Sequence, residues 1–170
     1  MRSIRLLAPA SAAFSACAPV DLPVPAPPVA LVDSSGESVG SVVAAQTSGG
    51  VTLTVNASGL PHGLHGIHVH ATGRCDAPKF ESAGAHWNPA GRKHGLENPD
   101  GSHAGDLPNV TVSSSGVLQA TVVLPSTSLA ELADSDGSAL VLHAGVDDYV
   151  SDPSGNSGAR IACAVLAPAR

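Results

Sequence analysis

Short apolar runs separated by turn residues fill most of the chain from Val29 onward. Runs rich in Val, Ile and Thr predict strands, and separators rich in Gly, Ser and Pro predict turns. The predicted strands cover 29–36, 39–45, 51–57, 64–70, 109–114, 117–124, 139–144 and 159–166. About eight strands with frequent turns favour an all-β domain, either a sandwich or a flattened barrel.

Two stretches, 71–108 and 145–158, do not fit a simple hairpin. Long loops in a compact domain are usually functional or disordered. Because these two stretches contain most of the unusual residues outside the strands, we predict that they are functional loops.

Composition agrees with a single all-β domain. The chain has 170 residues, of which 43% are hydrophobic but 2% aromatic, so its core must consist mainly of Val, Leu, Ile and Ala. The 18 Gly and 14 Pro residues interrupt the chain too often for long helices. A net charge of −6 without a Lys/Arg-rich run excludes nucleic acid and anionic membrane surfaces as partners. An anionic substrate therefore needs a local positive site.

The N-terminus has the pattern of an export signal. Arg2 and Arg5 precede an apolar stretch, 6–14, that is well short of the ~20 residues of a spanning helix. We predict a signal peptide over 1–17, a Pro-rich linker over 18–28 and the folded domain over 29–170. Cys17 follows two small residues, as in the lipobox of bacterial lipoproteins, and a signal-peptidase site nearby is the alternative. The expected location is periplasmic or otherwise extracytoplasmic, with membrane attachment only through a lipidated Cys17.

The chain contains three cysteines, Cys17, Cys75 and Cys163. If Cys17 belongs to the processing site, the other two form an even pair in an exported protein, where a disulfide is the expected state. A bridge closing so long a loop is worth roughly 4–5 kcal/mol in the chain-entropy model.

Eight histidines are the strongest chemical signal, at positions 62, 65, 68, 70, 86, 94, 103 and 143. Side chains alternate along a strand, so His68 and His70 point to the same face and can bind one metal ion together. His65 points to the other face, which predicts a core residue or one that supports a metal ligand. His62 is expected to be an ordinary surface residue.

The remaining histidines suggest two metal sites. His86, His94, His103 and Asp106 lie in the first long loop and form the ligand set of a closed tetrahedral zinc site. His143 ends an apolar strand, from which it could meet His68 and His70 across the barrel, and nitrogen-only ligation suits Cu(II). These candidates fall one short of two four-coordinate sites, and a histidine bridging both metals would close the gap.

Six fragments, "GLHGIHVH", "AHWNP", "RKHG", "HAGDLPNV", "LHAGVDD" and "GNSGARIACAVL", occur in an order that resembles copper/zinc superoxide dismutase. The resemblance covers about 39–166 and implies a Greek-key β-barrel with one copper and one zinc per subunit. It implies that copper is held by His68, His70, His86 and His143. It implies that zinc is held by His86, His94, His103 and Asp106, with His86 as the bridge.

The resemblance also implies roles for residues around the metals. Asp147 would link His68 to His94, and His65 would pack beneath the copper site. A Cys75–Cys163 disulfide would tie the metal loop to the last strand.

Two residues would act in catalysis by the same resemblance. Arg160 would lie over the copper and attract the substrate, and His86 would accept and return a proton. Superoxide would thereby be converted to dioxygen and hydrogen peroxide, in antioxidant defence outside the cytoplasm.

Some features differ from the animal members of this family. The interval between Asp147 and Arg160 is short and carries additional Asp residues, which predicts weaker electrostatic guidance of the substrate. Three basic residues compensate only if they reach the rim of the site: Lys79, Arg92 and Lys93. Trp87, beside the bridging histidine, is expected to pack against the loop.

Three other functions compete with the dismutase hypothesis. A non-catalytic metal-binding module or copper carrier would lack Arg160 or a copper ligand. A copper-only enzyme would lack the zinc ligands, and a secreted adhesion sandwich would leave the histidine pattern unexplained. The oligomeric state, monomer or homodimer, stays open at this point.

Overall fold

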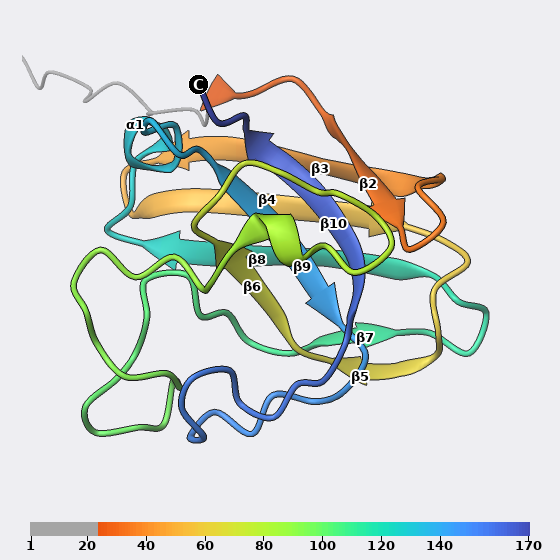
Figure 1. The fold of residues 1–170 in the computed structure, drawn as a ribbon. Coiled ribbons are helices and arrows are strands. Elements are labelled where there is room, and N and C mark those ends of the chain that lie inside the picture. Colours follow the sequence, from red (N-terminus) through yellow and green to blue (C-terminus); the bar gives the residue numbers. More distant parts are fainter. Residues whose placement is uncertain (1–23) are drawn as a thin grey trace, which may run out of the picture.

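The computed structural model describes residues 24–170 (Figure 1). The predicted signal segment 1–17 with Cys17, and residues 18–23 of the predicted linker, lie outside the described residues. Within the described part, no helix is long and apolar enough to cross a membrane.

Strands make up almost all of the regular secondary structure in the described chain, as its apolar pattern predicted. The strands are β1 (Val24–Pro25), β2 (Val29–Asp33), β3 (Ser38–Thr47), β4 (Gly50–Ala57), β5 (Gly63–His65), β6 (Ile67–His70), β7 (Val110–Val112), β8 (Leu118–Pro125), β9 (Ser138–His143) and β10 (Arg160–Ala167). Two short helices accompany them, the 3₁₀ helix η1 (Glu81–Ala83) and α1 (Leu129–Leu132). The all-β prediction is confirmed.

The strands form one large curled sheet and one small sheet. The 8-stranded sheet has the order β6-β9-β10-β2-β3-β4-β8, with β1 added on β3, and β5 pairs with β7 in a 2-stranded sheet. All the pairings are antiparallel. The consecutive strands β2, β3 and β4 lie side by side in the large sheet, and the last strand, β10, pairs with β2. The sheet curls around the core; the first part of the first long loop, with η1, lies across β9 and β10, and its later part lies with the second long loop at the bottom of the view (Figure 1).

Side-chain alternation places the core inside the curl. Along β8 the burial pattern runs BeieBeBe, with Leu118, Val122 and Leu124 buried. Strands β6 and β9 differ because every one of their residues is buried. Phe80, from the first long loop, packs on Val141 and Cys163 and so covers the outer side of β9 and β10. Strands β6 and β9, which carry His68, His70 and His143, are therefore enclosed on both faces.

The boundaries differ from the sequence prediction in three places. Strand pairing begins at Val24, inside the predicted linker, because Val24 and Pro25 pair with β3. The predicted strand 64–70 is broken at Gly66, whose N–H donates to Gly145 O (2.8 Å) and whose carbonyl accepts from His143 N–H (2.8 Å). The short helix α1 was not predicted, although Ser128 and Glu131 form the capping box that marks its start.

A disulfide fastens the first long loop to the sheet. Cys75 and Cys163 are bonded, with Cα atoms 5.7 Å apart and 88 residues apart in sequence. Cys163 lies on β10 and Cys75 lies before η1. The predicted disulfide is confirmed, and it joins the loop to the strand that carries Arg160.

Candidate metal centre

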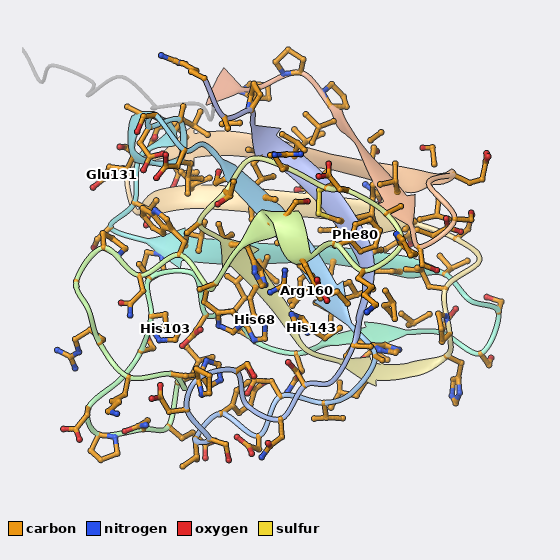
Figure 2. The ribbon with its side chains drawn as sticks, viewed as in Figure 1. His68, Phe80, His103, Glu131, His143 and Arg160 are labelled. Atoms are coloured by element: carbon orange, nitrogen blue, oxygen red, sulfur yellow. A yellow bond between two sulfur atoms is a disulfide. The ribbon has the colours of Figure 1, made fainter. Side chains whose placement is uncertain are left out.

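Four histidines converge at the loop end of the sheet; we call them the strand cluster. They are His68 and His70 of β6, His143 at the end of β9, and His86 of the first long loop. His86 is brought there because it forms an isolated antiparallel bridge with His70. All four side chains are buried. Figure 2 shows His68 and His143 side by side below η1, with Arg160 next to them.

The ring nitrogens of the strand cluster are arranged for a metal ion. The four atoms His68 Nδ1, His70 Nε2, His86 Nε2 and His143 Nε2 are buried and have no hydrogen-bond partner. One ligand atom from each of these residues lies within 4.8 Å of the others. A buried polar atom without a partner is costly, and native proteins rarely leave one. Four such nitrogens facing each other are satisfied together by one bound cation.

The opposite ring nitrogens fix how these rings are turned. His70 Nδ1 lies 2.9 Å from Gly84 O, and His143 Nδ1 lies 3.2 Å from Gly158 O. His68 Nε2 lies 2.6 Å from Asp147 Oδ2. Each of these nitrogens donates to its oxygen, which leaves the lone pair of the other nitrogen for a metal.

A second group, the loop cluster, meets at one carboxylate oxygen. Asp106 Oδ1 lies 3.0 Å from His86 Nδ1, 3.0 Å from His94 Nδ1 and 3.2 Å from His103 Nδ1. Four ligands held tetrahedrally at zinc distances of 2.0–2.1 Å would be roughly 3.3–3.4 Å apart. The donor set and its spacing therefore fit a zinc ion.

His103 belongs to the loop cluster on grounds of geometry. By distance alone, His68 could take the place of His103, because ligand atoms of His68, His86, His94 and Asp106 all lie within 4.8 Å of one another. However, His68 Nε2 is already bonded to Asp147, and His68 Nδ1 belongs to the strand cluster. His103 Nδ1 lies close to Asp106 and 3.4 Å from His86 Nδ1. His103 is therefore a more suitable fourth ligand for the loop cluster than His68.

Two residues connect the clusters. His86 contributes Nε2 to the strand cluster and Nδ1 to the loop cluster. Asp147, which is 2% exposed, places Oδ2 on His68 Nε2 (2.6 Å) and Oδ1 on His94 Nε2 (3.1 Å). One imidazole and one carboxylate thus span both clusters.

The histidines of the two clusters differ in how burial and neighbouring charges shift their pKa values. Burial lowers the pKa of His70 to about 2, of His143 to about 3 and of His86 to about 4. These rings are neutral at physiological pH, as metal ligation requires. Burial also opposes a charge on His94, but its hydrogen bonds with Asp106 and Asp147 prevail and raise its pKa to about 9.

The carboxylates of Asp106 and Asp147 stay ionised. Burial opposes this, but hydrogen bonds from the histidines outweigh it and hold the pKa of both carboxyl groups below its usual range. Asp106 Oδ2 also accepts from the backbone N–H groups of Gly95 (2.9 Å) and His103 (3.0 Å). The loop cluster therefore has the negative charge that a divalent cation needs.

Arg160 borders an open cavity at the strand cluster. Its Nη1 and Nη2 each donate at 2.6 Å, to Phe80 O and Gly84 O respectively. The cavity, about 290 Å³, is lined by His70, Ala85, His86, His143, Pro153, Ser154, Gly158 and Arg160. Gly84 O also accepts a hydrogen bond from His70 Nδ1. This one carbonyl therefore fixes the position of the Arg160 guanidinium relative to a strand-cluster histidine.

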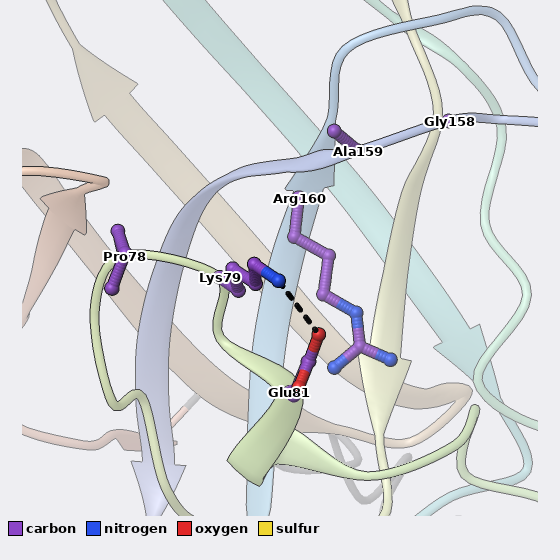
Figure 3. A pocket seen from close by; sticks show the side chains of 6 residues that line it. All are labelled: Pro78, Lys79, Glu81, Gly158, Ala159 and Arg160. Atoms are coloured by element: carbon purple, nitrogen blue, oxygen red, sulfur yellow. Dashed lines mark ion pairs between the residues drawn. The ribbon is translucent and has the colours of Figure 1, made fainter.

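A second cavity shares Gly158 and Arg160 with the first (Figure 3). It measures about 380 Å³ and is lined by Pro78, Lys79, Glu81, Gly158, Ala159 and Arg160. Lys79 therefore reaches the rim, but its Nζ lies 3.9 Å from Glu81 Oε1. Lys93 pairs with Asp152 (3.2 Å), and Arg92 donates to the carbonyls of Asp100 and Gly101. Arg92 and Lys93 line neither of these cavities.

The other predicted positions can be placed as well. His65 is buried, with Nδ1 2.8 Å from His143 O and Nε2 2.9 Å from Pro61 O, so it supports the strand that carries His143. Trp87 packs into the main core, and His62 is exposed. Sequence reasoning missed Gly84, because its carbonyl rather than its side chain acts. Its φ of 76° with ψ of −154° is a conformation that favours glycine.

Comparisons with known proteins agree with this geometry. Residues 38–166 match the family model described as copper/zinc superoxide dismutase. "Superoxide dismutase [Cu-Zn] 2" of Aquifex aeolicus is 44% identical over 142 residues, which is 80% of this chain and 83% of that protein. "Superoxide dismutase [Cu-Zn]" of Caulobacter vibrioides is 41% identical over 138 residues, covering 77% and 79% respectively.

Solved structures give the same picture. A SOD-like protein from Bacillus subtilis matches with a TM-score of 0.80 and 40% identity, over 84% of this chain and 99% of that chain. The Cu/Zn superoxide dismutase of Brucella abortus matches with a TM-score of 0.69 and 34% identity, over 82% and 98%.

Proposed function

The chain belongs to the copper/zinc superoxide dismutase family, and from this premise we propose that it converts superoxide into dioxygen and hydrogen peroxide. Copper is held by the strand cluster, through His68, His70, His86 and His143. Zinc is held by the loop cluster, through His86, His94, His103 and Asp106. The observation that carries the proposal is the set of four buried, unpartnered nitrogens beside Arg160.

The residues around the cavity have distinct tasks. Bound copper supplies the one-electron chemistry that oxidises one superoxide and reduces the next. Arg160, fixed by its two carbonyl partners, attracts the small anion and orients it in the cavity. In one half of the cycle His86 would take a proton from water at Nε2, the nitrogen that would otherwise face copper. In the other half it would pass this proton to the reduced substrate, and water would supply the second proton of hydrogen peroxide. Asp147 and the carbonyl of Gly84 keep the rings of His68 and His70 turned toward the metal.

We test this proposal on the whole chain loaded with copper and zinc. The measurement is superoxide dismutation beside metal content, for the wild type, His143→Ala and His62→Ala. The proposal expects high activity in the wild type and in the exposed control His62→Ala, and loss of activity in His143→Ala. A wild type that holds both metals but does not dismutate superoxide would overturn the catalytic proposal and favour the non-catalytic metal-binding module.

We also propose that the enzyme works outside the cytoplasm. Support comes from the signal-like segment 1–17 and from the Cys75–Cys163 disulfide, since such bonds persist in oxidising compartments. The test is the mass of the mature N-terminus after expression in a bacterium. A lipidated Cys17 indicates a membrane anchor, an unmodified N-terminus nearby indicates a soluble exported form, and an intact Met1 contradicts export.

A further inference from the structure

Asp147 has to be placed accurately because it serves both clusters. Its two oxygens orient His68 and His94, so a small movement of its backbone disturbs both rings. Asp147 lies in the second long loop and not on a strand. Something other than sheet pairing must therefore fix its position.

One amide side chain grips both backbone groups of Asp147. Asn109 Nδ2 donates to Asp147 O (2.9 Å), and Asp147 N–H donates to Asn109 Oδ1 (2.9 Å). An amide side chain suits this task because its NH2 group donates and its oxygen accepts, side by side on one rigid group. Asn109 directly precedes β7, so it ties the second loop to the 2-stranded sheet.

Tyr149, the single tyrosine of the chain, completes the arrangement. Its hydroxyl accepts from Asn109 N–H (2.7 Å), and its own N–H donates to Asp147 Oδ1 (2.7 Å). Its carbonyl accepts from Glu97 N–H (3.0 Å), which lies in the first long loop. Tyr149 has a φ of 63°, which is uncommon for a bulky residue and is retained only where its surroundings enforce it.

We propose that Asn109 and Tyr149 are positioning residues that hold Asp147 and thereby set the ring orientation at both metals. Neither residue lines the two cavities beside Arg160, so they act through Asp147 and not on the substrate. The proposal rests on the metal sites assigned under the proposed function. It predicts that loosening this pair disturbs copper and zinc together.

Asn98 provides a matched control. Its Nδ2 donates to His94 O (2.9 Å) and to Val150 O (3.2 Å), so it joins the same two loops and touches the backbone of a zinc-site histidine. Within residues 24–170 the Asn98 side chain makes no hydrogen bond with Asp147 or with a strand-cluster residue. Its loss is therefore expected to disturb the zinc site alone.

The experiment compares the full-length wild type, Asn109→Ala, Tyr149→Phe and Asn98→Ala, each loaded with Cu(II) and with Co(II) in place of zinc. The readouts are the Cu(II) EPR spectrum, the Co(II) visible absorption and the affinity of each metal against a competing chelator. We expect Asn109→Ala to change both spectra and to lower the affinity for each metal by about tenfold. This is the lower end of the effect seen when a group that supports a metal ligand is lost. Tyr149→Phe, which removes one hydroxyl, is expected to change both spectra less, and Asn98→Ala only the cobalt spectrum.

The outcomes separate this inference from the proposed function. A wild type that binds neither metal at the expected sites overturns the proposed function, and this inference with it. A normal wild type with an unchanged Asn109→Ala, or with an Asn109→Ala that affects cobalt alone, overturns this inference only. If Asn109→Ala does not fold, an unchanged copper spectrum in Tyr149→Phe overturns it instead.

Discussion

The strand cluster and the loop cluster share His86 but are assembled differently. In the strand cluster, three of the four histidines stand on β6 and β9, so pairing in the large sheet positions them. In the loop cluster every residue comes from the first long loop, between β6 and β7. The first site is therefore set by the core of the fold, whereas the second depends on contacts that the loop makes with itself and with the second loop.

The two clusters also differ in charge. Strand-cluster rings are buried without an adjacent carboxylate at their free nitrogens, and burial keeps His70 and His143 neutral. The loop cluster is arranged around Asp106, and Asp147 adds a second negative charge at His94. The loop cluster therefore has a carboxylate among its own ligands, whereas the strand cluster has carboxylates only behind its rings, at His68 and at the shared His86.

The largest effect is expected from removing the disulfide that ties the first loop to β10. The double variant Cys75→Ser, Cys163→Ser is expected to lose roughly 4–5 kcal/mol in the free energy of unfolding, an upper figure from chain entropy for a loop of this length. The measurement is urea unfolding of the metal-free protein. Wild type treated with a reductant is the matched control, and equal stability of oxidised wild type and variant would contradict the prediction.

Replacing a loop-cluster histidine and replacing a strand-cluster histidine are expected to have different effects on zinc affinity and on the motion of the first long loop. His103→Ala is expected to lower the affinity for zinc by more than about a hundredfold, which exceeds the effect of losing a residue that only hydrogen-bonds to a metal ligand. It is also expected to speed hydrogen exchange across 88–103. His143→Ala is expected to leave zinc affinity and exchange in that loop near wild type. Zinc competition with a chelator and exchange mass spectrometry give the answer. Equal loosening of the loop in both variants would show that the clusters are not assembled separately.

Arg160 tests the substrate side of the strand cluster. Arg160→Ala is expected to lower the dismutation rate by about tenfold, because the local positive charge is lost while the metals stay in place. Arg160→Lys is expected to recover part of the rate, since it keeps the charge but cannot form both carbonyl hydrogen bonds. The rate is measured as a function of ionic strength. A rate in Arg160→Ala equal to that of wild type would remove Arg160 from the mechanism.

A fourth prediction concerns how the stability of the metal-free protein depends on pH. The pKa values of His70, His86 and His143 are lowered from 6.5, so the unfolded chain binds more protons and stability falls as pH drops from 6.5 toward about 4. The pKa of His94 is raised from 6.5 to about 9, so its contribution is lost as pH rises through that window. We expect a stability maximum near pH 6.5 in denaturant titrations. Stability that rises steadily to pH 9 would contradict the assignment of His94.

The local sequence pattern predicted most strands and the orientation of two histidines. The features that it did not predict depend on contacts between residues far apart in the sequence. Alternation was enough to put His68 and His70 on one face, and apolar runs located the main strands. The break at Gly66 could not be read locally, because a side chain there would press on Ser157 and Asp147, about eighty or more residues away. The disulfide followed from cysteine count and compartment.

The chemistry of the site was less visible in the sequence than its residue types. The pattern does not say which nitrogen of each ring faces the metal, because that depends on partners such as Gly84 O and Gly158 O. The grip of Asn109 on Asp147 joins residues 38 positions apart, with no motif linking them. Helix α1 is the exception, since its Ser128–Glu131 capping box was readable from the sequence.

The central claim is that the strand cluster binds copper and the loop cluster binds zinc. Anomalous diffraction from crystals of the metal-loaded protein, collected at the copper and zinc edges, tests it directly. The account predicts a copper peak enclosed by His68 Nδ1 and the Nε2 atoms of His70, His86 and His143. It predicts a separate zinc peak enclosed by Asp106 and the Nδ1 atoms of His86, His94 and His103. A single shared peak, or zinc alone in the strand cluster, would contradict the account.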